Sequence, residues 1–180
     1  YYYENPYLPV CYSAHASMIM GILFGDDVTG DFGEMGTFEY RGMAPAAAVS
    51  IYETNWFIYK RVIAPDAPAM DVDVMHISWG TDANDVVTMW WQRGIDAMVE
   101  RDECVVVAGC GNGTSEFDGI SKPSWGYNVI SVGAGRSVGS WPDNLSLIGP
   151  PAPEESSFGP TSDGRAKPDI IAPGLSLGPC

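Results

Sequence analysis

Short apolar runs rich in β-branched residues recur along this chain and alternate with helical or loop segments. The runs are Val49–Tyr52, Val72–Ser78, Val105–Ala108, Val129–Val132 and Ile170–Ala172. Such alternation is typical of an α/β fold, in which a parallel sheet is flanked by helices. Because the runs are almost continuously hydrophobic, we expect their strands to be buried on both faces.

Two segments between these runs have helical patterns. The longer helix is predicted from about Asp85 to Arg101, with Asn84 or Asp85 as its N-cap and with Gly94 weakening its middle. Its expected apolar face comprises Val86, Met89, Trp90, Ile95, Met98 and Val99. A shorter helix is predicted to begin just after His15 and to continue through Leu23.

Glycine and proline mark the irregular parts of the chain. The stretch Gly25–Gly42 is glycine-rich and acidic, and we expect an irregular insertion there. The stretch Ser137–Ser157 contains several prolines and is predicted to be a surface loop. The segment around Asp163, Arg165 and Lys167 is interpreted as a surface turn.

Charge and hydropathy exclude several classes of protein. The 180 residues carry 23 acidic and 9 basic side chains, a formal net charge of −14. A nucleic-acid partner is not expected, because a phosphate-binding surface must be basic. With 46% hydrophobic and 18% charged residues, the chain is not a disordered polyanion. It contains no apolar run of the roughly 18 residues that a membrane-spanning helix needs.

A glycine-rich turn follows the run Val105–Ala108 and has the beginning of a dinucleotide-binding motif. The third glycine position is Thr114, however, and no helical periodicity follows that could supply a helix N-terminus for phosphates. No acidic residue ends the next strand to hold a ribose hydroxyl. We therefore interpret this segment as a tight turn that exposes Asn112, and nucleotide binding remains a weak third hypothesis.

The cysteines and histidines do not predict a metal site. The four cysteines lack the spacing of zinc ligands, and Cys104 and Cys110 are expected to be buried thiols. His76 lies on an apolar strand and is interpreted as a core histidine whose hydrogen bonds are satisfied.

Several segments, in the same order along the chain, resemble motifs of the subtilisin-like serine peptidases (subtilases). The segments are His15–Gly21, Gly42–Val49, Val74–Gly80, Val106–Asn112, Val129–Ala134 and Asp163–Gly174. The first resembles the catalytic-histidine motif His-Gly-Thr-His-Val-Ala-Gly, and the fourth resembles Val-Ala-Ala-Ala-Gly-Asn, which carries the oxyanion-hole asparagine. The resemblance implies a doubly wound, mainly parallel sheet with helices on both faces, here as an incomplete domain.

The resemblance also implies a serine-type endopeptidase that works through an acyl-enzyme. His15 would be the general base, since an imidazole takes and returns protons near neutral pH. Asn112 would donate its side-chain amide to the oxyanion. The expected substrate-binding residues are Ser78, Trp79 and Gly80, with Gly109, Cys110 and Gly111 lining a roomy pocket for the residue before the scissile bond. Trp79 could equally be a core residue.

Two parts of the family's catalytic triad have no match in this sequence. Nothing before His15 matches the aspartate motif Asp-Thr-Gly or Asp-Ser-Gly, and nothing after Gly174 matches the serine motif Gly-Thr-Ser-Met-Ala-x-Pro. Gly113–Ser115 has the order Gly-Thr-Ser but lacks the rest of the motif, so Ser115 is interpreted as a turn residue. We expect residues 1–180 to be the central part of one peptidase domain and to be inactive alone.

The remaining expectations also depend on the resemblance. Partners would be peptide or protein substrates, with no membrane partner, and the protein would be secreted. No cofactor is expected; a structural calcium ion could involve Asp26, Asp27, Asp31 and Glu34, but their spacing favours a solvated acidic loop. The alternative function is a catalytically dead subtilase-like module that binds peptides or proteins. The oligomeric state is left open.

Overall fold

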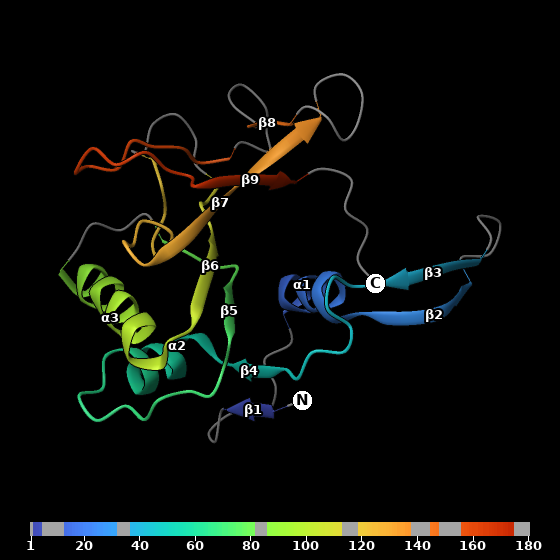
Figure 1. Ribbon diagram of the computed structural model, residues 1–180, viewed down its shortest axis with the longest axis horizontal. Coiled ribbons are helices and arrows are strands. Elements are labelled where there is room, and N and C mark those ends of the chain that lie inside the picture. The colour runs from blue at the N-terminus through green and yellow to red at the C-terminus, as the bar shows by residue number, and fades with distance from the viewer. Residues whose placement is uncertain are drawn as a thin grey trace. The chain divides into compact units, whose positions relative to one another are not determined.

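A computed structural model describes residues 2–4, 13–31, 37–81, 86–112, 119–137, 145–147 and 156–174 (Figure 1). The chain divides into two compact units. The first comprises Tyr1–Trp56 and Ser176–Cys180, and the second comprises Phe57–Leu175. Among the described helices, none is both long enough and apolar enough to cross a membrane.

The first unit contains helix α1, Ala14–Phe24, which carries the predicted general base in its first turn. The helix begins one residue before His15, because Ser13 is its N-cap and accepts a hydrogen bond from the Ala16 N–H at 3.3 Å. A serine in this position satisfies one of the N–H groups that a helix leaves without a partner at its start. The prediction of a short helix here is confirmed, with its start moved by this cap.

The expectation of an irregular insertion over Gly25–Gly42 is wrong. Strands β2, Asp26–Asp31, and β3, Thr37–Arg41, pair as an antiparallel hairpin in this stretch. The pairing register shifts between Asp27 and Gly30. Such a bulge accommodates glycine and breaks the period-two pattern by which a strand is detected in a sequence.

The hairpin returns the chain to the C-terminal end of α1. The Met43 N–H donates to the Ile22 carbonyl at 3.1 Å, and the Ala44 N–H donates to the Leu23 carbonyl at 2.7 Å. These carbonyls are among those that a helix leaves without an intrahelical partner at its end. Gly42 lies so close that a Cβ atom there would be 2.6 Å from the carbonyl carbon of Leu23. Residues 42–44 therefore cap the helix that carries the histidine.

Two short strands complete the first unit. Strand β1, Tyr2–Glu4, pairs in parallel with β4, Ser50–Tyr52, in a register that places Tyr3 opposite Ile51. Strand β4 confirms the prediction for Val49–Tyr52. Helix α2, Thr54–Phe57, and the π-helical turn η2, Ile58–Val62, follow, and sequence periodicity did not indicate either.

The second unit is built around a parallel sheet. Its parallel strands are β5, Val74–Ile77; β6, Val105–Gly109; β7, Val129–Ser137; and β9, Ile170–Pro173. Strand β6 pairs with β5 and β7, and β7 pairs with β9, all in parallel. The predicted α/β class with a mainly parallel sheet is confirmed. Figure 1 shows helix α3, Val86–Asp102, beside these strands.

Burial alternates along the described strands of the sheet, and one of its faces is much more buried than the other. Met75, Val106 and Ser131 belong to the buried face, whereas Val74 is 62% exposed and Val105 is 45% exposed. The expectation of burial on both faces is therefore wrong for the described residues. His76 lies on the exposed face with Val74, so it is not a core histidine.

Helix α3 confirms the longer helical prediction, although the proposed caps, Asn84 and Asp85, lie outside the described residues. Its apolar face is the expected one in part, because Ile95 and Met98 are buried as predicted, whereas two other residues are not. Trp90 is 67% exposed and Met89 is 39% exposed. The buried side chains are Thr88, Trp91, Gln92, Ile95 and Met98. Burial follows the helical spacing of 88, 91, 95 and 98, and hydrophobicity alone misplaced the two exposed residues.

Gly94 allows close packing in the middle of α3. A Cβ atom at this position would lie 2.6 Å from Cγ1 of Val62 in η2. The glycine that weakens the helix by its intrinsic propensity therefore lets it approach its neighbour closely.

The stretch Ser137–Ser157 is not entirely a loop. Strand β7 extends to Ser137, and β8, Leu145–Leu147, pairs with it in antiparallel orientation. Ser156 and Ser157 are buried. The rest of this stretch lies outside the described residues.

We predict that Gly42→Ala destabilises the first unit. The added methyl would clash with the backbone at Leu23, and overpacking of this kind costs about 1–3 kcal/mol. At each urea concentration, hydrogen exchange at the α1 amides should be faster in the variant than in the unsubstituted protein. Gly109→Ala is the matched control, because a Cβ placed there would meet no described atom within 4 Å beyond its own chain neighbours. Equal protection of α1 in the two variants would contradict the capping role of residues 42–44.

Candidate functional site

Two of the predicted site segments leave the sheet at the same edge. Ser78–Gly80 follows β5, and Gly109–Asn112 ends β6 and continues beyond it. The strands are parallel, with Ile77 opposite Ala108. Their carboxyl ends therefore lie next to each other, which is where open α/β sheets bind ligands.

A segment far along the chain joins these two strand ends. The main chains of Thr81 and Lys122 form an antiparallel bridge with hydrogen bonds of 3.1 and 2.9 Å. On its other side, Ser121 donates its N–H to the Cys110 carbonyl at 2.9 Å and its hydroxyl to the same oxygen at 3.2 Å. Residues 121–122 thus connect the ends of β5 and β6 through main-chain hydrogen bonds.

Ser121 also occupies the space that the small residues leave open. A Cβ atom would lie 2.7 Å from Ser121 Oγ if placed at Gly80 and 2.6 Å from it if placed at Gly111. A buried hydroxyl therefore fills the space beside Gly80 and Gly111, whereas a Cβ atom at Gly109 would meet no described atom within 4 Å. The roomy pocket expected at Gly109–Gly111 stays a prediction. Sequence analysis missed Ser121, and nothing local marks it, since its partners are distant in the chain.

The turn before Asn112 has a backbone conformation that favours glycine. Gly111 has φ of +105°, where a side chain would be unfavourable. The Gly111 carbonyl accepts the Ser157 N–H at 2.9 Å, and the Cys110 N–H donates to the Val132 carbonyl at 2.9 Å. Asn112 itself is exposed at the end of this fixed turn.

Cys110 is a structural residue of the same turn. Its thiol lies 3.1 Å from the Ser156 hydroxyl and donates to the Ser157 carbonyl at 2.9 Å. Burial raises the pKa of this thiol above its ordinary value. Since the thiolate is the nucleophilic form, Cys110 is unreactive near neutral pH. The predicted buried state of Cys104 and Cys110 is confirmed.

Trp79 is half-buried and packs against α3. Its ring centroid lies 5.5 Å from that of Trp91, with the two rings tilted by 51°. The side chain therefore anchors the segment after β5 to the helix and keeps part of its surface accessible. Both interpretations of Trp79, as core residue and as pocket wall, agree with this position.

The segment predicted as a surface turn near Asp163 contacts the neighbouring chain extensively. Lys167 is largely buried and donates to the Val129 carbonyl at 2.8 Å and to the Asp169 carboxylate at 2.6 Å. Burial alone would raise the pKa of Asp169, but hydrogen bonds from Lys167 and from the Ser131 N–H outweigh it and lower that pKa. The prediction of a surface turn is therefore only partly right, because Lys167 in this segment is largely buried.

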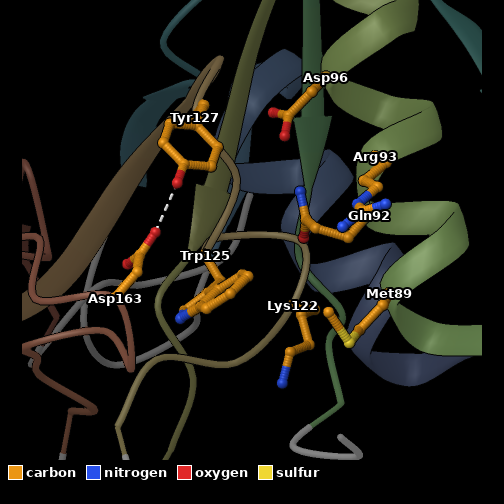
Figure 2. A pocket seen from close by; sticks show the side chains of 8 residues that line it. All are labelled: Met89, Gln92, Arg93, Asp96, Lys122, Trp125, Tyr127 and Asp163. Carbon is orange, nitrogen blue, oxygen red and sulfur yellow. Dashed lines mark hydrogen bonds between the residues drawn. The ribbon is translucent and has the colours of Figure 1, made fainter. Parts of the chain in front are cut away.

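A hollow of about 270 Å³ lies between α3 and residues 122–127 (Figure 2). The side chains that line it are Met89, Gln92, Arg93, Asp96, Lys122, Trp125, Tyr127 and Asp163. Within the described part of the chain, the buried amide of Gln92 has no hydrogen-bond partner. Asp96 accepts the Asn128 N–H at 2.9 Å, which fixes the end of the turn against the helix.

The catalytic assignments themselves stay predictions. His15 is exposed in the first turn of α1, in the first unit, and Asn112 belongs to the second unit. Ser115 and Glu34 lie outside the described residues.

Among the acidic residues considered for calcium, Asp26 is the one whose side chain the structure describes. Asp26 begins β2, and its carboxylate is 3.5 Å from the Arg41 guanidinium. Over the ranges that the structure describes, no three histidine, cysteine or acidic side chains gather as metal ligands would. A structural calcium ion stays an untested expectation.

Comparison with known proteins supplies the family. The chain is 29% identical over 164 residues to serine protease AprX of Bacillus subtilis (strain 168), an alignment that covers 77% of this chain. The chain spans only about a third, 34%, of that relative's length. The sequence profile of the subtilase family matches residues 2–178 and runs through both units. This protein therefore belongs to the subtilase family.

Proposed function

We propose that the natural protein is a serine endopeptidase whose general base is His15 and whose oxyanion donor is Asn112. One observation carries most of the proposal: the segments after β5 and β6, which match family motifs, leave a parallel sheet at the same edge and are joined there by Ser121 and Lys122. That edge is the usual ligand site of such sheets. Membership of the subtilase family supports the reaction class.

In this mechanism the nucleophilic serine attacks the scissile carbonyl while His15 accepts the serine proton. His15 then returns the proton to the leaving amine, and water releases the acyl group in the second half of the reaction. The side-chain amide of Asn112 donates a hydrogen bond to the oxyanion that develops on the carbonyl. No residue of the printed sequence is assigned as the nucleophile, because Ser115 lacks the family's motif.

The substrate would bind as an extended peptide along the segments that follow β5 and β6. Main-chain groups of Ser78–Gly80 would pair with the substrate backbone, a mode that recognises peptide bonds more than side chains. Gly109–Gly111 would face the residue before the scissile bond, with Ser121 setting the depth of that space. Peptides and proteins are the proposed substrates, and an extracellular location is proposed from the family's habit.

The test compares His15→Ala and Asn112→Ala in the natural protein. Loss of the general base should reduce peptide hydrolysis to background. Loss of one oxyanion donor should lower kcat by roughly 100- to 1,000-fold with little change in KM, because the donor acts in the transition state. Steady-state kinetics on a fluorogenic peptide measure both effects.

Asn55→Ala is the matched control, since this exposed asparagine interacts with Glu53 in the first unit. It should retain the activity of the unsubstituted natural protein, which we call the parent. If the parent binds peptide substrates without hydrolysing them, the endopeptidase proposal is wrong. The protein is then a peptide-binding member of the family.

We also predict that Ser121→Gly changes substrate preference. Removing the Ser121 side chain enlarges the space beside Gly80 and Gly111. The ratio of kcat/KM for peptides with a large against a small residue before the scissile bond should rise about tenfold, the scale on which pocket size discriminates. Ser50→Gly, at an exposed position in β4, is the control. An unchanged ratio would remove Ser121 from the pocket.

A further inference from the structure

A single arginine holds the turn that follows Ser121 and Lys122. The guanidinium of Arg165 donates to the Trp125 carbonyl at 2.8 Å and to the Gly126 carbonyl at 3.3 Å. Its Nε donates to the Asp163 carboxylate at 3.0 Å. The planar guanidinium can make these bonds at once because its donors are fixed in a fork.

The same guanidinium lies against two aromatic rings of the turn. Its central carbon is 3.8 Å from the Tyr127 ring centroid and 5.4 Å from the Trp125 ring centroid. Tyr127 in turn donates its hydroxyl to Asp163 at 2.6 Å (Figure 2). Asp163, Arg165 and Tyr127 therefore form a closed cluster, which we call the Arg165 clasp.

The clasp is connected to the proposed substrate pocket through Trp125. The ammonium group of Lys122 lies 5.6 Å from the centroid of the same indole ring. Two cations, Arg165 and Lys122, are thus attracted to one ring. Lys122 forms the bridge to Thr81 and follows Ser121, so its position determines where the Ser121 side chain lies.

On its inner side the turn has little freedom to move. A Cβ atom at Gly126 would lie 2.3 Å from Nε2 of Gln92 and 2.7 Å from Oδ1 of Asp96. The turn is therefore pressed against α3, and the Arg165 clasp holds it from the other side. A displacement of Trp125 would therefore also displace Lys122 and the adjacent Ser121 side chain, which forms the wall of the proposed substrate pocket.

We infer that Arg165 is a positioning residue for substrate selection, which acts through Trp125 and Lys122 to fix the wall formed by Ser121. This inference rests on the proposed function, because it assumes that the substrate binds beside Gly80 and Gly111. Arg165 itself contacts no reacting atom in this account. Loss of Arg165 should weaken peptide binding and reduce the preference for one type of side chain before the scissile bond. The rate of the chemical step should stay almost unchanged.

The test compares Arg165→Met and Arg165→Lys with the parent in the natural protein. The first readout is the Kd of a peptide whose scissile amide is replaced by a non-cleavable methylene-amine, measured by fluorescence titration. Arg165→Met should raise this Kd by roughly tenfold, the change typical of losing a few well-placed contacts. Arg165→Lys keeps the charge but loses the fork, so its Kd should lie between those of the parent and Arg165→Met.

Arg101→Met is the matched control, because Arg101 also donates to a main-chain carbonyl, that of Arg61, and pairs with Asp102 away from this turn. Its Kd should equal that of the parent. The rate of labelling by a small fluorophosphonate, which reports the catalytic centre alone, should be the same in all four proteins. The thermal unfolding midpoint of each variant separates a local effect from general destabilisation.

A double-mutant cycle identifies the route of the effect. If Arg165 acts through Ser121, Arg165→Met should change side-chain preference much less in the Ser121→Gly background than in the parent. If the effects of the two substitutions on side-chain preference are additive, Arg165 does not act through Ser121. If the Kd of Arg165→Met equals that of the parent, Arg165 is not a positioning residue. A parent that binds the peptide but neither cleaves nor labels would contradict only the proposed function. A parent that binds no peptide would contradict both.

A spectroscopic signature checks the clasp independently of substrate. The hydrogen bond from Tyr127 to the Asp163 carboxylate raises the pKa of this phenol. In Asp163→Asn the charge that stabilises the protonated phenol is removed, so the pKa of Tyr127 should fall towards its ordinary value. Ultraviolet titration against a Tyr127→Phe reference measures it. An unchanged titration would show that Tyr127 and Asp163 are not joined in solution.

Discussion

Main-chain hydrogen bonds from Ser121 and Lys122 to Cys110 and Thr81 determine the arrangement of the proposed site. The two strand ends that they join belong to neighbouring strands of a parallel sheet, and the link connects the segments that follow them. Backbone groups buried at such a junction need partners, and here the partners come from the neighbouring segment. The site is therefore defined by pairing between loops at the end of a regular sheet.

The long segment Asp163–Gly174 matters for the same reason. It resembles a family motif, and in the structure its charged side chains serve the turn and strand beside it. Arg165 and Lys167 satisfy carbonyls of Trp125, Gly126 and Val129, which lie close to one another along the preceding chain. Asp169 accepts the Ser131 N–H and pairs with Lys167. Charged side chains of this segment, which the sequence analysis assigned to a surface turn, thus fix the backbone near the site.

Local sequence patterns predicted part of the regular structure. Strands β4, β5, β6, β7 and β9 and helices α1 and α3 follow from β-branched runs and from helical spacing, because each depends on residues close in sequence. The short elements β1, β8, α2 and η2 were not predicted. The hairpin β2–β3 was missed because its glycines and bulge disturb the period of two. The apolar face of α3 was predicted correctly at Ile95 and Met98 but wrongly at Trp90, which is hydrophobic yet exposed, because the neighbours of a helix determine which of its sides is buried.

The sequence by itself determined the family resemblance, the α/β class and the identity of His15 and Asn112 as candidates, since each is carried by short contiguous motifs. Only the tertiary structure decided that Ser121 fills the space beside Gly80 and Gly111 and that Arg165 holds the adjoining turn. The physical reason is that these contacts join residues about 10 to 40 positions apart, and no pattern within one segment encodes which distant group will lie against it.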